Sequence, residues 1–165
     1  MELTDLKELF VEQLKDLYSA EKQISKALPK MAKKATSPKL AKAFELHQQE
    51  TEGQIERLER IFEHLEVPAR ARKCKGMEGL LEESQEIMAE AQGETLDAGL
   101  IAAAQKVEHY EIASYGTLRT YARILGDNWS ASLLQQTLDE EGRTDKKLSE
   151  LAESEINLQA AEQQA

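Results

Sequence analysis

Two glutamates, Glu108 and Glu111, interrupt the apolar side of a long amphipathic segment that includes KVEHYEIASYG at residues 106–116. Apolar residues recur before and after them at alternating steps of three and four, which is the spacing of one helix face. Both carboxylates therefore fall where leucines would be expected. Carboxylate oxygens bind divalent metal ions, so two of them one helical turn apart form a candidate metal-binding motif.

Acidic groups interrupt the apolar faces of three other segments at a similar level. These segments contain Glu21, then His47 with Glu50, and then Glu141 with Asp145. Counting along each predicted helix places all of them, with the pair above, in one layer about 7 Å thick. The apolar faces contain no lysine or arginine at this level that could neutralise the acids.

Three states of such a layer are possible, because the acids must be protonated, hydrated or bound to a cation. One glutamate on an apolar face usually reaches solvent at its edge, and one histidine is usually satisfied within the core. Five or six acids in one dry layer are different, since burying each unpaired carboxylate costs several kcal/mol. Two divalent ions would balance four carboxylates, and oxygen ligands with one imidazole suit iron or manganese better than structural zinc. We therefore favour a di-metal site.

Four long helices are needed to position these residues. Periodicity and capping residues predict helices over about residues 4–34, 37–65, 95–125 and 128–154. Short links predict two antiparallel hairpins, joined by a long crossover over residues 66–94 that carries a short helix. The predicted fold is all-α, a ferritin-like four-helix bundle. An extended coiled coil fits the spacing but not the breaks at Pro38, Gly93 and Gly126.

The composition agrees with one helical domain over residues 1–155, followed by a frayed tail over residues 156–165. The chain has 165 residues, a net charge of −10 and a single cysteine. The negative charge argues against nucleic-acid and anionic-membrane partners, and no apolar run is long enough to span a membrane. A lone cysteine and an N-terminus without a secretory signal pattern predict a cytoplasmic protein.

Five ordered sequence blocks, which together span about residues 6–153, carry a family resemblance. They are LKDLYSAEKQISKALPKM, HQQETEGQIERLERIFEHL, KCKGMEGLLEE, AAAQKVEHYEIASYGTL and TLDEEGRTDKKLSELAE. In these blocks the chain resembles the YciF-like family of bacterial ferritin-like stress proteins. The resemblance implies a rubrerythrin-like bundle, a homodimer and a di-iron centre. Carried onto this sequence, the ligands of that centre would be Glu21, His47, Glu50, Glu108, Glu111 and Glu141, with Asp145 as a further candidate.

The ligand pattern departs from the usual ferritin-like one, in which two helices each supply a Glu-x-x-His pair. The second helix has the reversed order His47-x-x-Glu50. The fourth has Glu141 followed by Thr144 or Asp145 where a second histidine would be expected. The missing histidine leaves both the metal and the oxidase activity open.

Two functions are compatible with these residues. The first is a protein with two iron ions, or two manganese ions, that reacts with oxygen or peroxide and oxidises Fe(II) in a stress response. The second is a metal-free helical protein that dimerises or binds a partner, with its core acids protonated or paired.

Three other residues have chemistry that could matter. Tyr18 and Tyr115 each lie about one turn from a candidate ligand, where they could donate a hydrogen bond or carry an oxidising equivalent, although packing in the core is the usual role of such a ring. Cys74 lies in the basic sequence RARKCK, which would lower its pKa if the thiol were exposed. An ordinary loop thiol is the simpler interpretation.

Overall fold

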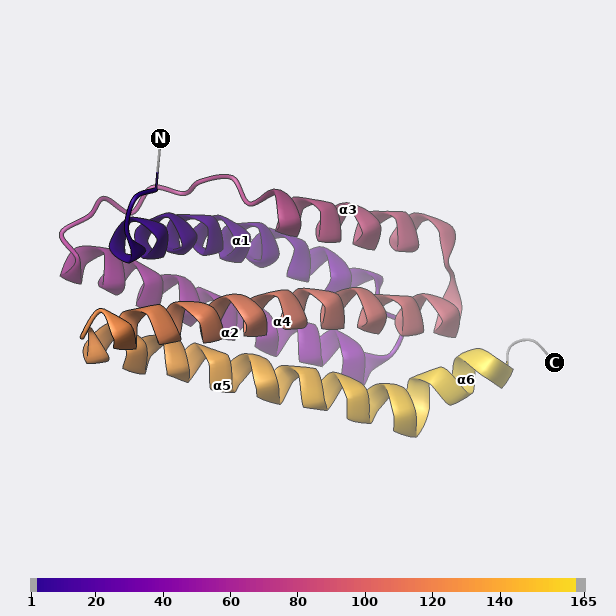
Figure 1. Cartoon of the computed structure of the whole chain (residues 1–165). Helices are drawn as coiled ribbons and strands as arrows, with labels where there is room; N and C mark the ends of the chain where they lie inside the picture. Colours follow the sequence, from indigo (N-terminus) through magenta and orange to yellow (C-terminus); the bar gives the residue numbers. More distant parts are fainter. Residues whose placement is uncertain (1–2, 163–165) are drawn as a thin grey trace.

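The computed structural model describes residues 3–162, and nearly all of them lie in helices (Figure 1). In chain order these are α1 (Leu6–Lys34), α2 (Pro38–His64), α3 (Lys75–Glu90), α4 (Gly93–Ile124), α5 (Asn128–Leu151), a π-helical turn (Ala152–Ile156) and α6 (Asn157–Glu162). Residues 3–162 contain no β-strand. The structure confirms the prediction of an all-α fold with four long helices and a short extra helix in the crossover.

Side-chain caps begin three of the four long helices, α1, α2 and α5, close to the predicted positions. The Asp5 side chain accepts a hydrogen bond from the backbone N–H of Glu8, so Asp5 caps α1. Ser37 caps α2 and is followed by Pro38, as predicted, and Asp127 caps α5. Each cap satisfies a backbone amide that has no partner within its own helix.

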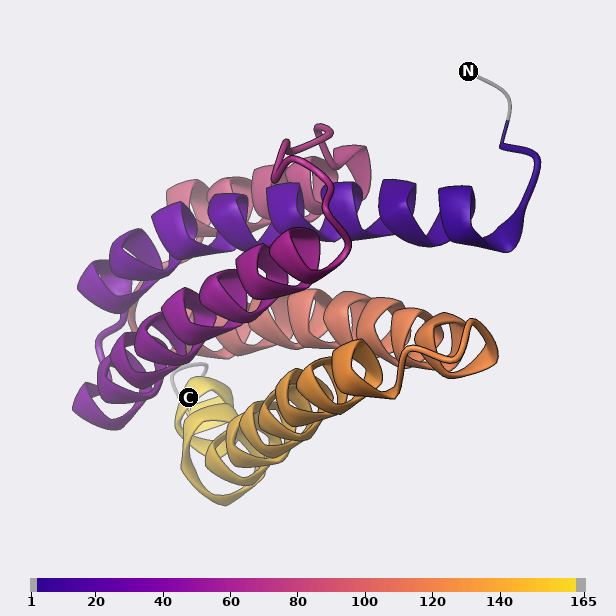
Figure 2. The same cartoon turned by 90° about the vertical axis from the view of Figure 1, so that its left-hand side faces the viewer.

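The four long helices form two antiparallel hairpins that pack side by side (Figures 1 and 2). Helix α1 packs on α2 and α4, and α5 packs on α4 and α2, so the four make a closed ring around one core. The crossover runs back along the outside of the bundle, and its helix α3 covers α1 and α4. As a result, α4 runs in the same direction as α2.

Asp97 joins the two hairpins at one end of the bundle. Its buried carboxylate accepts hydrogen bonds from the backbone N–H groups of Thr36 and Ser37, both at 2.8 Å, and from the Thr36 hydroxyl at 2.5 Å. The turn between α1 and α2 is thereby fixed to the first turns of α4. This contact helps to set the height of α4 relative to the first hairpin.

The C-terminal segment differs from the predicted frayed tail over residues 156–165. The chain stays helical to Glu162, and the Ile156 side chain, 1% exposed, belongs to the core. Helix α6 packs against α4, so the sequence pattern missed an apolar anchor after the break in α5. Residues 163–165 lie outside the described part of the chain.

None of the helices in the described part of the chain is both long enough and apolar enough to cross a membrane.

Replacing Leu58 by alanine should lower the free energy of unfolding by about 2–5 kcal/mol, because this side chain is 1% exposed in the core. Leu46→Ala on the same helix is the control: Leu46 is 43% exposed, and its loss should cost about 0.5 kcal/mol or less. Urea unfolding of both variants measures the difference. Equal losses would show that the core-facing side of α2 is assigned incorrectly.

Candidate metal centre

Four buried side chains from three helices converge at mid-height in the core. His47 comes from α2, Glu108 and Glu111 from α4, and Glu141 from α5. Each offers one ligand atom, and these atoms all lie within 4.8 Å of one another. None of the four residues is more than 3% exposed. The predicted layer therefore exists, and it brings these four predicted ligands together.

Glu21 of α1 belongs to the same buried group. It is 0% exposed, and one of its carboxyl oxygens, Oε1, accepts a hydrogen bond from the Tyr115 hydroxyl. The charges of Glu21, Glu108 and Glu111 act on one another, so Glu21 belongs with the other acids. We call the five residues Glu21, His47, Glu108, Glu111 and Glu141 the acid cluster.

Glu50 lies at the edge of the acid cluster. Its side chain is 34% exposed, and its Oε2 is 3.8 Å from Nδ1 of His47. The same oxygen accepts a hydrogen bond from the Thr144 hydroxyl at 3.2 Å. Of the predicted ligands, Glu50 is therefore the one that connects the acid cluster to solvent.

Asp145, the further candidate, is not brought to the acid cluster. Its carboxylate accepts a hydrogen bond from Gln105 at 3.2 Å and lies 3.3 Å from Nε2 of the exposed His109. Four helical steps of about 100° leave Asp145 about 40° around α5 from Glu141, and there it meets Gln105 and His109 of α4 instead of the acid cluster. Thr144, and not Asp145, points toward the edge of the group.

The donor atoms of the acid cluster fit a metal ion because most of them are buried without a hydrogen-bond partner. Seven atoms of the acid cluster have no hydrogen-bond partner within residues 3–162. They are Oε2 of Glu21, both ring nitrogens of His47, Oε2 of Glu108, both carboxyl oxygens of Glu111 and Oε2 of Glu141. Nε2 of His47 is 2.9 Å from Oε1 of Glu108, yet the contact is too bent to be a hydrogen bond. Buried polar atoms normally have hydrogen-bond partners, so this set of donor atoms fits the binding of a cation or of protons.

Burial dominates the electrostatics of the acid cluster. It raises the pKa of Glu21 to about 7, against the hydrogen bond from Tyr115, which lowers it. Burial also raises the pKa of Glu111 and of Glu141 well above the usual value, and neighbouring carboxylates add to the shift. For His47 burial lowers the pKa, but Glu108, Glu50 and Glu141 outweigh it and raise the pKa well above its usual value.

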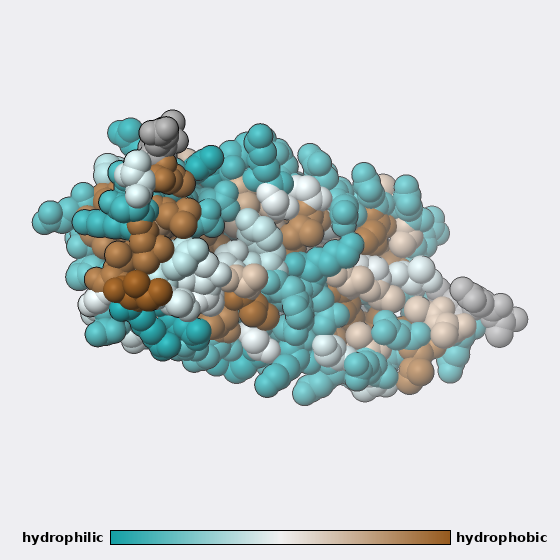
Figure 3. Space-filling view, in the orientation of Figure 1, coloured by the Kyte–Doolittle hydropathy of each residue, from teal (hydrophilic) through white to brown (hydrophobic). Residues whose placement is uncertain are grey.

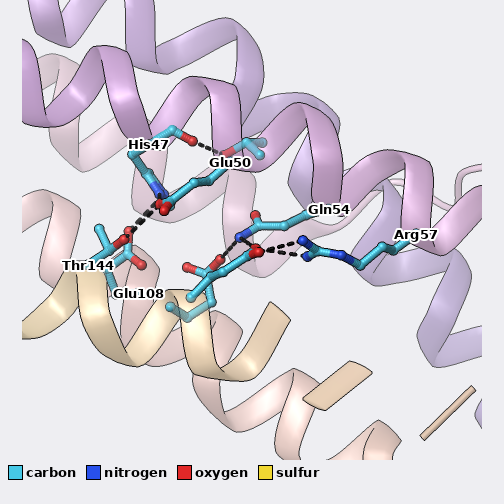
Figure 4. Close-up of polar contacts among 9 residues, drawn as sticks. His47, Glu50, Gln54, Arg57, Glu108 and Thr144 are labelled. Atoms are coloured by element: carbon cyan, nitrogen blue, oxygen red, sulfur yellow. Dashed lines mark hydrogen bonds and ion pairs between the residues drawn. The ribbon is translucent and has the colours of Figure 1, made fainter. Parts of the chain in front are cut away.

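Two buried polar residues of α2, Thr51 and Gln54, contact members of the acid cluster and were not predicted as site residues. Figure 4 shows Gln54 beside the cluster. The Thr51 hydroxyl donates to the backbone oxygen of His47 at 2.9 Å. The Gln54 amide donates to Glu141, and also to Glu140 at 3.1 Å. Both residues are 0% exposed. Their signal in the sequence was a polar side chain on the apolar face of a helix.

Tyr115 and Tyr18 have different surroundings. Tyr115 is 1% exposed and donates to Glu21, so it contacts the acid cluster directly. Tyr18 donates to Glu59 at 2.6 Å and packs edge-to-face on Phe62, away from the cluster.

Cys74 is not an exposed loop thiol. It is 0% exposed, it caps α3, and its sulfur lies 3.0 Å from the Tyr110 hydroxyl. Burial raises the pKa of this thiol, opposite to the direction that the basic neighbours in sequence suggested for an exposed thiol.

The fold and this group of side chains define a helical-bundle protein with a buried cluster of acids. The chain belongs to the family described as "Domain of unknown function (DUF892)", whose model matches residues 5–161. It is 48% identical over 162 residues to the protein YciF of Escherichia coli (strain K12), an alignment that covers 97% of this chain and 98% of that protein. The predicted resemblance to YciF-like proteins is therefore confirmed.

Solved structures agree with this assignment. The crystal structure of the Escherichia coli stress protein YciF matches with a TM-score of 0.89 over 94% of this chain and 99% of that one, at 48% identity. YcfI of Rhodopseudomonas palustris, described as a candidate structural protein, matches with a TM-score of 0.87 at 40% identity, over 90% and 95% of the two chains.

The metal-free protein should lose stability as the pH rises from about 5 to about 8. Below pH 4.5 the carboxyls of Glu21, Glu111 and Glu141 are protonated in both the folded and the unfolded chain. Above it the unfolded chain releases these protons first, because the folded pKa values are raised, to about 7 for Glu21. The raised pKa of His47 acts in the same direction. The melting temperature of chelator-treated protein measures the effect.

Glu111→Gln is the comparison for this experiment, since it removes one of the shifted groups and should flatten the pH dependence. A melting temperature of the wild-type protein that stays constant or rises over this range would contradict the raised pKa values.

Proposed function

We propose that this protein binds two metal ions in the acid cluster, iron first and manganese as the alternative, and reacts there with oxygen or peroxide in a stress response. The observation that carries this proposal is the set of buried donor atoms that face one another without partners. A donor set of carboxylates with one imidazole suits these metals. The description of the related Escherichia coli protein as a stress protein supports the biological setting.

The residues have distinct roles in this proposal. His47 would supply the nitrogen ligand, and Glu21, Glu108, Glu111 and Glu141 would supply the charge that balances two divalent ions, with Glu50 where the group reaches solvent. Iron bound there would supply the electrons that reduce oxygen or peroxide while Fe(II) is oxidised. Tyr115 holds one oxygen of Glu21 by its hydrogen bond, and the apolar side chains above and below the layer exclude water.

Anaerobic titration with Fe(II) should show about two ions bound per chain. Binding to the folded state alone raises the melting temperature, because it stabilises that state by RT ln(1 + [L]/Kd). Glu108→Gln removes a charged ligand at nearly constant volume and should reduce both the affinity and the metal-induced shift in melting temperature. Asp145→Asn is the matched control and should behave like the wild type, since Asp145 lies outside the acid cluster.

The absence of saturable binding of Fe(II) and Mn(II) by the wild type would overturn the di-metal proposal. If metal binds, addition of oxygen or peroxide to the Fe(II)-loaded protein tests the reaction: bound Fe(II) should be oxidised faster than Fe(II) mixed with Glu108→Gln.

An exposed apolar surface favours a second candidate function, a bundle that acts through dimerisation or a partner. Leu3, Ile124, Leu125 and Trp129 are 40–68% exposed. The hollow beside Leu125 and Trp129 is lined by residues of α1, α2 and the α4–α5 turn. Figure 3 shows apolar surface gathered at this end of the molecule. Contiguous apolar surface of this kind is typical of an interaction site.

Ile124→Glu should convert a wild-type dimer to a monomer if this surface is the dimer interface, because a charge would be buried there without a partner. Leu158→Glu is the control: Leu158 is also exposed, at 58%, but belongs to α6. Sedimentation velocity of both variants and the wild type separates the outcomes. A monomeric wild type, or a dimer that survives Ile124→Glu, would remove this interface.

A further inference from the structure

Gln54 is a buried amide aimed at the acid cluster. It is 0% exposed, and its Nε2 donates hydrogen bonds to Oε1 of Glu141 and to Oε2 of Glu140, the latter at 3.1 Å (Figure 4). Its own oxygen, Oε1, is buried and has no hydrogen-bond partner in the described part of the chain. Buried polar atoms are normally hydrogen-bonded, so a glutamine with an unpartnered oxygen is unusual for a residue that only fills the core.

An ion pair at the rim of the bundle fixes the orientation of the Gln54 amide. Arg57 donates through both terminal nitrogens to Glu140, with Nη1 at 2.8 Å from Oε2, and Nη1 also contacts the Thr137 hydroxyl at 2.8 Å. Glu140 is therefore held in place as a hydrogen-bond acceptor. Because an amide donates through nitrogen alone, Gln54 must turn its nitrogen toward both carboxylates.

The same contact fixes which oxygen of Glu141 faces the centre. Gln54 occupies Oε1 of Glu141, whereas Oε2 is buried without a partner. The carboxylate is thereby held so that a single free oxygen remains for a ligand. Outer hydrogen bonds of this kind orient metal ligands and set their affinity.

Thr144 does not compensate for the histidine that α5 lacks, because its hydroxyl donates to Glu50. His47, the histidine of the acid cluster, lies against Glu108 at 2.9 Å and near Glu50 at 3.8 Å. His47 offers a nitrogen that lies within 4.8 Å of a ligand atom of Glu141, so the two residues belong to one group of ligands. Gln54 is the buried amide that contacts Glu141 from outside this group.

We propose that Gln54, oriented by the Arg57–Glu140 pair, is a positioning residue that holds Glu141 so that its Oε2 stays free to bind metal in the acid cluster. This inference rests on the proposed metal binding.

The test compares Gln54→Met with Gln49→Met, an exposed glutamine on the same helix. Methionine keeps the length and volume of the side chain but removes the donor. In anaerobic Fe(II) titrations Gln54→Met should weaken binding by about 10–100-fold relative to the wild type. Gln49→Met should match the wild type.

A second variant keeps the inference testable if Gln54→Met folds poorly. Glu140→Gln breaks the pair with Arg57 at a half-buried position and should weaken Fe(II) binding by a smaller factor than Gln54→Met. Nuclear magnetic resonance of the metal-free protein gives a readout without metal: the side-chain amide protons of Gln54 should be shifted downfield and exchange slowly. Glu141→Gln should move them.

The outcomes separate this inference from the function on which it rests. Fe(II) binding that Gln54→Met leaves unchanged overturns the role of Gln54 and leaves the di-metal proposal standing. A wild type that binds no Fe(II) overturns both.

Discussion

Burial of several acids in one layer of the core, without a basic side chain to neutralise them, is the constraint on which the rest of this structure depends. In residues 3–162 no lysine or arginine nitrogen lies within 4.0 Å of a carboxyl oxygen of the four glutamates in the acid cluster; the nearest base is His47. Each unpaired buried carboxylate costs several kcal/mol, so the layer must take up protons or cations. Folding stability and cation binding are therefore properties of the same groups.

The layer exists because four helices keep a fixed register. A shift of one helix by one residue moves its side chains by 1.5 Å along the axis and by about 100° around it, which would take a carboxylate from the core to the rim. Several contacts resist such a shift. Asp97 ties the α1–α2 turn to α4, and Gly126, with φ of 79°, ends the α4–α5 turn in a conformation that favours glycine. Caps at Ser37 and Asp127 fix where the second helix of each hairpin begins.

Polar residues outside the acid cluster divide its surroundings into two unlike sides. On one side His47 contacts Glu108 and Glu50, and Thr144 holds Glu50. On the other a chain of contacts runs from Arg57 through Glu140 and Gln54 to Glu141. The family model matches residues 5–161, and its description names no function. The difference between the two sides is therefore read from the contacts of these residues alone.

The sequence by itself determined the helices, most of their limits and the existence of the polar layer. Periodicity and capping are local, and each residue on a helix has a calculable height, so the meeting of Glu21, His47, Glu108, Glu111 and Glu141 was predictable. Tertiary structure decided what depends on the rotation of one helix against another. Glu141 faces the core while Asp145, one turn away, pairs with Gln105 at the rim, and Tyr115 rather than Tyr18 reaches a cluster acid. Burial of Cys74 and Ile156 was decided in the same way, because each is covered by segments distant in sequence.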